Sequence, residues 1–249
     1  MIVHSFDNQS EPVFGPEAFL GPQRHLCELC ILTFSERIFG ELQTRFPVRT
    51  VGTIRSVNGE HPICLFEYAG KTIGALLLSV GATGAGNDLI ELNWQTGATK
   101  FLAFGSAGSL NRAETEGKYV IPTEAYRDEG MSYHYAPPAD YIRIGTADAL
   151  ANLFDELRLP YVKGRVWTTD APYRETRNQV AARQAEGCIA VEMELSGLQA
   201  ICNFHGFTLY DFLVTGDVLD APVYENEGLH DANHNFDKLD IALELAKRI

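Results

Sequence analysis

Acidic side chains stand at two points where an apolar run of the sequence ends. Glu192 and Glu194 flank Met193 in VEMELSG, where a strand-like run gives way to helical spacing. Burying two carboxylates there is costly unless they meet donors such as sugar hydroxyls. Asp217 lies in VTGDVLD, and an aspartate at the end of a strand can serve as a general acid. The alternatives are a glutamate that only caps a helix start and an aspartate that only forms an Asx turn.

Two further segments combine residue types that bind small molecules. FGSAGSL places Gly105 and Ser106 after an apolar run, and amides with a hydroxyl there can hold an anion or sugar hydroxyls. WTTDAPYRET carries Tyr173 and Arg174, which can stack on and hydrogen-bond a heterocycle. A plain Gly-Ser turn and a capped helix that begins at Asp170 are the alternatives.

Residues that could hold a metal or act as a serine nucleophile are sparse. Cys27 and Cys30 form one C-x-x-C inside a strand-like run, so we expect their thiols not to converge. With no second pair of cysteines, we also expect no zinc site. His134 is read as a packing or rim residue. His230 and His234 are four residues apart, but they lack the glutamate of a zinc-protease motif and lie in a polar loop. The motif G-x-S-x-G does not occur. The sequence therefore predicts no metal site.

Charge and composition exclude several classes of partner. The 249 residues contain 20 Lys and Arg against 33 Asp and Glu, a formal net charge of -13, and no basic run. We therefore expect no binding to a nucleic acid polymer. No apolar run approaches the roughly 20 residues of a membrane span, so no membrane association is expected. The absence of a signal-like start and the sparse, odd set of five cysteines favour the cytoplasm.

The elements that must position these residues alternate along the chain. Residues 1–25, interrupted by proline and glycine, predict an irregular arm, and 26–249 predict a single α/β domain. We expect strands at about 26–34, 50–56, 61–69, 72–80, 100–106, 118–121, 131–135, 161–168, 188–193 and 208–216, and helices at 35–46, 85–97, 146–158, 195–204 and from about 235. This pattern predicts a three-layer αβα sandwich with a mixed, largely parallel sheet covered by helices on both faces. Ligands bind at the carboxyl ends of such strands, where all four segments lie.

Taken in order, FGSAGSL, WTTDAPYRET, VEMELSG and VTGDVLD resemble the nucleoside phosphorylase family. That family includes hexameric purine nucleoside phosphorylases, uridine phosphorylases and the methylthioadenosine/adenosylhomocysteine nucleosidases. The resemblance covers about 26–249. It implies a ribose-binding segment at Glu192, Met193 and Glu194, with Glu194 on the 2′- and 3′-hydroxyls. It also implies that Asp217 protonates the base as it leaves.

The resemblance extends to the rest of the site and to the partners. It implies contact with phosphate or the attacking water at Gly105 and Ser106, with the base at Tyr173 and Arg174, and with the sugar at Thr83 and Gly84. No metal or redox cofactor is implied, and inorganic phosphate would be a co-substrate. The expected partners are a small-molecule nucleoside, phosphate and further copies of the chain, as a homodimer or homohexamer.

One position departs from the phosphorylase pattern. Phosphorylases of this family usually carry an arginine three residues before the Gly-Ser serine, and here that position is Ala103. Arg37 and Arg55 are the candidates to replace its charge. We expect a phosphorylase that converts a ribonucleoside, by preference of a purine, to free base and ribose 1-phosphate. The alternatives are a nucleosidase that uses water and a nucleoside-binding protein without catalysis, and a strand-end acid counts against the latter.

Overall fold

The apolar runs form the strands of one mixed sheet in the computed structural model, which describes residues 1–57 and 59–249. The strands are β1 (Leu29–Thr33), β2 (Arg49–Ser56), β3 (Gly59–Tyr68), β4 (Lys71–Leu77), β5 (Lys100–Ser109), β6 (Tyr119–Asp128), β7 (Tyr141–Arg143), β8 (Tyr161–Thr169), β9 (Cys188–Glu192) and β10 (Thr208–Val218). Across these residues the order is β10-β6-β8-β9-β5-β1-β4-β3-β2, with β7 beside β6.

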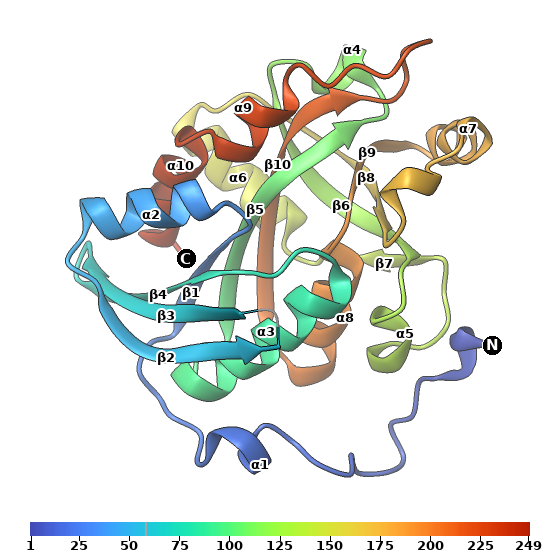
Figure 1. Cartoon of the computed structure of the whole chain (residues 1–249). Helices are drawn as coiled ribbons and strands as arrows, with labels where there is room; N and C mark the ends of the chain where they lie inside the picture. The colour runs from blue at the N-terminus through green and yellow to red at the C-terminus, as the bar shows by residue number, and fades with distance from the viewer. Residues whose placement is uncertain (58) are drawn as a thin grey trace.

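Parallel pairing dominates the centre of the sheet. Strand β1 lies between β4 and β5, and β5 also pairs with β10, all in parallel (Figure 1). Strand β10 pairs with β6 as well, so that both of its edges are hydrogen-bonded. The carboxyl ends of β1, β5 and β10 therefore meet at one edge of the sheet, where a ligand can reach them.

Helices cover both faces of this sheet. They are η1 (Ile2–His4), α1 (Glu17–Leu20), α2 (Glu36–Arg45), α3 (Ala82–Thr96), α4 (Arg112–Thr115), α5 (Ser132–Tyr135), α6 (Ala147–Leu157), η2 (Pro172–Arg174), α7 (Arg177–Ala185), α8 (Leu195–His205), α9 (Leu229–His234) and α10 (Asp237–Ala246). Alternate strand residues face opposite ways. Leu32 packs in the cluster under α3 and α8, and its neighbour Ile31 packs with α2, α6 and α10.

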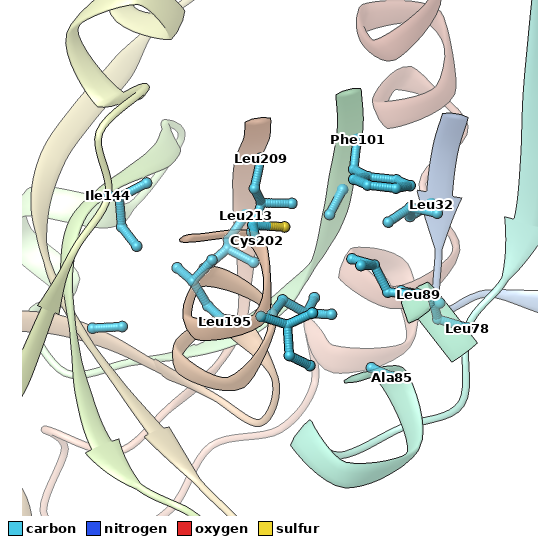
Figure 2. Close-up of a cluster of buried hydrophobic side chains, with 14 of the residues drawn as sticks. Leu32, Leu78, Ala85, Leu89, Phe101, Ile144, Leu195, Cys202, Leu209 and Leu213 are labelled. Carbon is cyan, nitrogen blue, oxygen red and sulfur yellow. The ribbon is translucent and has the colours of Figure 1, made fainter. Parts of the chain in front are cut away.

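The first of these two cores lies beside the candidate site. Leu89 of α3 and Leu195 of α8 pack with Phe101 of β5 and with Leu209 and Leu213 of β10 (Figure 2). Because these side chains exclude water on that face, the start of α8 is held rigidly against the sheet. The three-layer α/β architecture expected from the sequence is confirmed.

Several boundaries differ from the expectation. The segment 131–135, read as a strand, is the short helix α5. It is held by Glu129, whose carboxylate accepts from the amides of Met131 and Ser132. The strand read at 118–121 continues as β6 to Asp128, because a register shift accommodates Pro122 without ending the pairing.

The two cysteines of the C-x-x-C also differ from the expectation. Strand β1 begins at Leu29, after Cys27, so Cys27 is free to turn toward Cys30. Their Sγ atoms lie 3.8 Å apart. Gly74 of β4 makes room for both, since a Cβ there would collide with the Cys30 sulfur. The prediction that the thiols do not converge was wrong.

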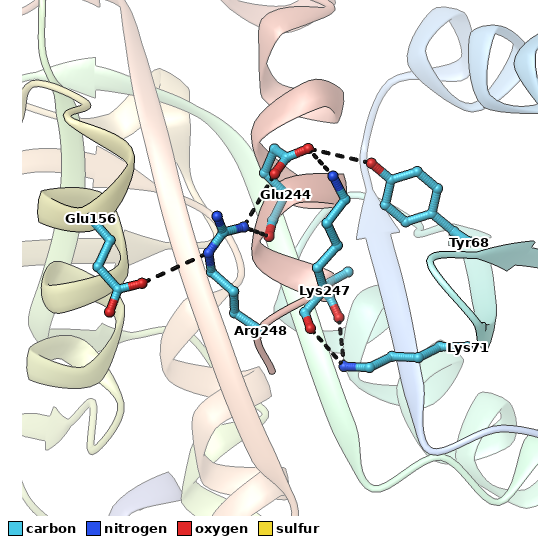
Figure 3. Close-up of polar contacts among 7 residues, drawn as sticks. Tyr68, Lys71, Glu156, Glu244, Lys247 and Arg248 are labelled. Carbon is cyan, nitrogen blue, oxygen red and sulfur yellow. Dashed lines mark hydrogen bonds and ion pairs between the residues drawn. The ribbon is translucent and has the colours of Figure 1, made fainter.

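The last helix is anchored to distant parts of the chain (Figure 3). Arg248 just beyond α10 lies 3.8 Å from the Glu156 carboxylate of α6. Tyr68 donates to Glu244 at 3.5 Å, and Lys71 donates to the carbonyls of Ala246 and Lys247 at 3.0 and 3.1 Å. These contacts fix α10, and through it the position of α9 at the sheet edge.

Candidate active site

A cavity of about 760 Å³ opens at the carboxyl ends of β1, β5, β9 and β10. Glu192, Met193 and Glu194 line it at the end of β9, and Asp217 lines it from β10. Gly105, Ser106 and Tyr173 also line the cavity, so the topology gathers seven of the ten expected site residues. Arg174 is exposed and lies outside the lining.

Glu194 is a buried carboxyl group in the wall of this cavity. Its Oε1 accepts from the Gly81 amide at 2.6 Å. Gly81 precedes α3 with φ of 89°, a backbone conformation that favours glycine. Thr83 and Gly84, expected to border the sugar, lie in the first turn of α3 and do not line the cavity. Burial, with the charge of Glu192, raises the pKa of Glu194.

Glu192 has a different set of contacts from Glu194. Its Oε2 accepts from the amides of Glu194 and Leu195 at 2.7 Å each, and its Oε1 accepts from the Thr168 hydroxyl. The carboxylate thus holds the first amides of α8, the arrangement that a helix start favours. Glu192 is a positioning residue that sets the direction of Glu194.

Asp217 faces the cavity because β10 is irregular at that point. The register with β5 shifts between Thr215 and Asp217, and such bulges redirect side chains. Its partner Gly108 leaves the space open, since a Cβ there would lie 2.5 Å from Leu219. Tyr224 donates to the Asp217 carboxylate at 2.9 Å. Burial raises the pKa of Asp217, which favours the protonated form that a general acid requires.

The same end of the cavity holds two residues that the sequence analysis missed. Glu175 lines the cavity, and burial together with the charge of Asp217 raises its pKa to about 7. Arg177 also lines it and donates to the carbonyls of Leu219 and Ala221 at 3.2 and 2.7 Å, which fixes the loop after Asp217. A signal for Glu175 was present, because it follows Arg174 directly in the YRET motif.

The Gly-Ser turn is covered by the C-terminal part of the chain. The Ser106 hydroxyl donates to the side chain of Asn233 in α9. Behind the turn, the buried Lys238 ammonium donates to the carbonyls of Gly105, Ala232 and Asn233 at 3.3, 2.5 and 3.5 Å. Burial lowers the pKa of Lys238 to about 8.

His234 lies beside this turn, although the sequence placed it in an uninvolved polar loop. Its Nδ1 is 2.8 Å from the hydroxyl of Ser35, the residue that caps α2. Both residues line the cavity. Arg37 contacts His230 Nε2 at 3.2 Å and does not line the cavity. Arg55 pairs with Glu60 on the exposed hairpin of β2 and β3.

The donor set of the site does not suit a metal. Within residues 1–57 and 59–249, no group of three His, Cys, Asp or Glu side chains is arranged to hold one. The site can instead bind a sugar through Glu194, protonate a leaving group with Asp217, and bind a small nucleophile near Ser106 and His234.

None of the described helices is both long and apolar enough to cross a membrane.

Residues 28–246 match the sequence profile of the Phosphorylase superfamily. The chain belongs to that superfamily. A DeoD-type purine nucleoside phosphorylase of Exiguobacterium sp. is 25% identical over 60% of this chain and 67% of its own length. An uncharacterised protein of Acanthamoeba polyphaga mimivirus is 27% identical over 72% of both chains.

Solved structures with a similar fold are named for other activities. The Campylobacter jejuni 5′-methylthioadenosine/S-adenosyl homocysteine nucleosidase has a TM-score of 0.72 at 15% identity, covering 90% of this chain and 100% of that one. The Bacteroides thetaiotaomicron AMP nucleosidase has a TM-score of 0.66 at 17% identity, covering 90% of both. At these identities the likeness establishes the fold alone. Membership of the superfamily makes this chain one of a family of enzymes that cleave nucleoside glycosidic bonds.

Ala103 separates this member of the Phosphorylase superfamily from the phosphorylase pattern. It is buried on β5, where its Cα partner on β10 is Asp211. Asp211 is also buried, and its Oδ2 has no hydrogen-bond partner among the described residues. Burial raises the pKa of Asp211 well above its usual range, which favours the neutral carboxyl group. The strand therefore presents no cation to the cavity at this point.

Proposed function

We propose that the protein cleaves the N-glycosidic bond of a purine ribonucleoside. The observation that carries this proposal is that Asp217 and Glu194 line one cavity, with the pKa of Asp217 raised by burial. Cleavage passes through a sugar with oxocarbenium character while negative charge builds on the base. Asp217 would protonate the leaving purine, and Glu194 would bind the ribose hydroxyls and stabilise the positive charge.

We propose water as the nucleophile. The two cationic side chains that line the cavity, Arg177 and Lys238, donate to backbone carbonyls. A phosphate dianion therefore meets no free cation within the described part of one chain, and such contacts are worth about 1.5–3 kcal/mol each. The solved structures named as nucleosidases support the same proposal.

Phosphorolysis is the second candidate. The relatives named purine nucleoside phosphorylase favour it. It would require a cation from outside the chain, which an arginine of a second copy would supply if the protein assembles as a homo-oligomer. A phosphate held mainly by the amides of Gly105 and Ser106 would bind weakly.

We expect the rate of base release to be independent of phosphate. Adenosine and inosine would each be incubated with the enzyme in phosphate-free buffer and in buffer with phosphate up to about 50 mM. That concentration is well above a Kd for phosphate in the millimolar range. The sugar product would be identified as ribose, from hydrolysis, or as ribose 1-phosphate, from phosphorolysis. A rate that rises from zero and saturates with phosphate would establish phosphorolysis and overturn the hydrolytic proposal.

We expect Glu175 to select the substituent at position 6 of the purine. With Asp217 protonated and facing N7, an ionised Glu175 nearby can accept from a 6-amino group but would oppose a 6-oxo group. Glu175→Ala should lower kcat/KM for adenosine by roughly 10- to 150-fold, the value of a hydrogen bond to a charged group, and lower that for inosine less. Glu175→Gln, which keeps the shape, is the control. Equal losses on both substrates would contradict this role.

A further inference from the structure

The hydrolytic proposal leaves open which group receives the proton of the attacking water. Helix α9 brings His234 against Ser35, the residue that caps α2, and Asn233 against Ser106 of β5, and all four residues line the cavity that Asp217 and Tyr224 also line. We propose that His234 binds the attacking water through Nε2 and accepts its proton. This inference rests on the proposed hydrolytic function.

The contacts of the imidazole leave one nitrogen available. Ser35 Oγ already accepts from the Ile38 amide at 3.2 Å, and it lies 2.8 Å from His234 Nδ1. A hydroxyl oxygen has two lone pairs, so it can accept both N–H groups at once. The same contact also fits the other tautomer, in which the Ser35 hydroxyl donates to Nδ1. The tautomer that we propose has Nδ1 donating to Ser35, which leaves a lone pair on Nε2. No described residue forms a hydrogen bond with Nε2, and the ring lines the cavity.

The charges around His234 keep it neutral. Partial burial lowers its pKa, and the neighbouring His230, Arg37 and Lys238 lower it further. These groups face it from α9, α2 and α10, so each helix packed around the ring contributes. The His230 ring is itself fixed, because its Nε2 lies 3.2 Å from the Arg37 guanidinium, which can only donate. A neutral imidazole at pH 7 is a competent base.

The step balances without a cofactor. The water oxygen forms a bond to C1′ of the ribose while the bond from C1′ to the purine nitrogen breaks, and its electron pair stays on the base. Asp217 gives its proton to the base, and one water proton passes to His234 Nε2. Ribose and free purine leave, and the two side chains return to their first states by exchanging protons with solvent.

The test compares His234→Gln with His134→Gln, a change at an exposed histidine that does not line the cavity. We expect His234→Gln to lower kcat for adenosine hydrolysis about 10²- to 10⁴-fold, the usual value of general base catalysis, with KM changed little. His134→Gln should stay within a few-fold of the parent. Added imidazole should restore part of the rate to His234→Ala in a saturable manner.

The pH profile of kcat separates a base from a structural residue. Protonation of His234 should lower kcat at low pH in the parent and in His134→Gln, and this part of the fall should be absent in His234→Gln.

Three outcomes would overturn the inference. If His234→Gln keeps the kcat of the parent and the same fall of kcat at low pH, His234 is not the base. Loss of rate together with loss of binding of a C-nucleoside analogue of adenosine, in both His234→Gln and His234→Asn, would make the residue structural. If the main defect of His234→Gln is a higher KM for phosphate, His234 binds an anion instead. If the parent cleaves no nucleoside at all, the proposed function itself fails, which is a separate result.

Discussion

Asp217→Asn is expected to lower kcat on purine ribonucleosides about 10²- to 10⁴-fold, because the variant removes the proton donor to the leaving base. Asparagine fills nearly the same volume and still accepts from Tyr224, which donates to Asp217 at 2.9 Å. Binding of a C-nucleoside analogue should therefore stay within a few-fold of the parent. Rates of adenosine and inosine cleavage under single-turnover conditions measure the effect on the chemical step.

The pH profile gives Asp217 a second signature. Burial raises its pKa, and the acid works only when protonated. Asp217 therefore limits the rate of the parent only on the alkaline side, where the rate falls as the pH rises through the raised pKa, and this alkaline fall should vanish in Asp217→Asn. Tyr224→Phe is the control, because it removes only the hydroxyl that donates to the Asp217 carboxylate and favours its ionised form. A parental rate on purines in Asp217→Asn would contradict the assignment.

Glu194→Ala is expected to harm ribonucleosides more than 2′-deoxyribonucleosides. A charged acceptor facing a hydroxyl is worth about 1.5–3 kcal/mol, so kcat/KM for adenosine should fall roughly 10- to 150-fold more than that for 2′-deoxyadenosine. Glu194→Gln, which retains an acceptor and the contact to the Gly81 amide, should show a smaller difference. Equal losses of kcat/KM on both substrates would show that Glu194 only occupies the start of the helix.

Proton release on binding tests the same residue independently. Burial and the charge of Glu192 raise the pKa of Glu194 in the empty site. Hydroxyl donors favour the ionised carboxylate, so nucleoside binding should lower this pKa and release protons near pH 7. Titration calorimetry in two buffers of different ionisation enthalpy measures that release. It should be present in the parent and absent in Glu194→Ala.

The strands and the main helices could be predicted because their signals are local. Alternation along β1 sends Leu32 and Ile31 to opposite faces, and a buried parallel sheet reads as apolar runs. The errors came where one contact overrides the pattern. The Glu129 carboxylate turns 131–135 into a helix, and a register shift carries β6 past Pro122. Neither contact can be read from the spacing of apolar residues.

The residues of the site likewise include some that could be predicted from the sequence and some that could not. Glu194 and Asp217 could be placed because each follows a strand whose carboxyl end reaches the cavity. Glu175, Tyr224 and His234 lie in loops or in a short helix without periodicity, and they reach the cavity only because distant segments fold back over it. His234 in particular depends on the anchoring of α10, which no local pattern encodes.

The pairing of Ala103 with Asp211 decides whether the fold could accept an arginine at position 103. An unpaired guanidinium buried in a strand costs several kcal/mol, enough to unfold many domains. An arginine at position 103 would lie beside the buried Asp211 carboxyl group, whose Oδ2 has no hydrogen-bond partner among the described residues. Loss of the Asp211 proton would then balance the new charge inside the fold.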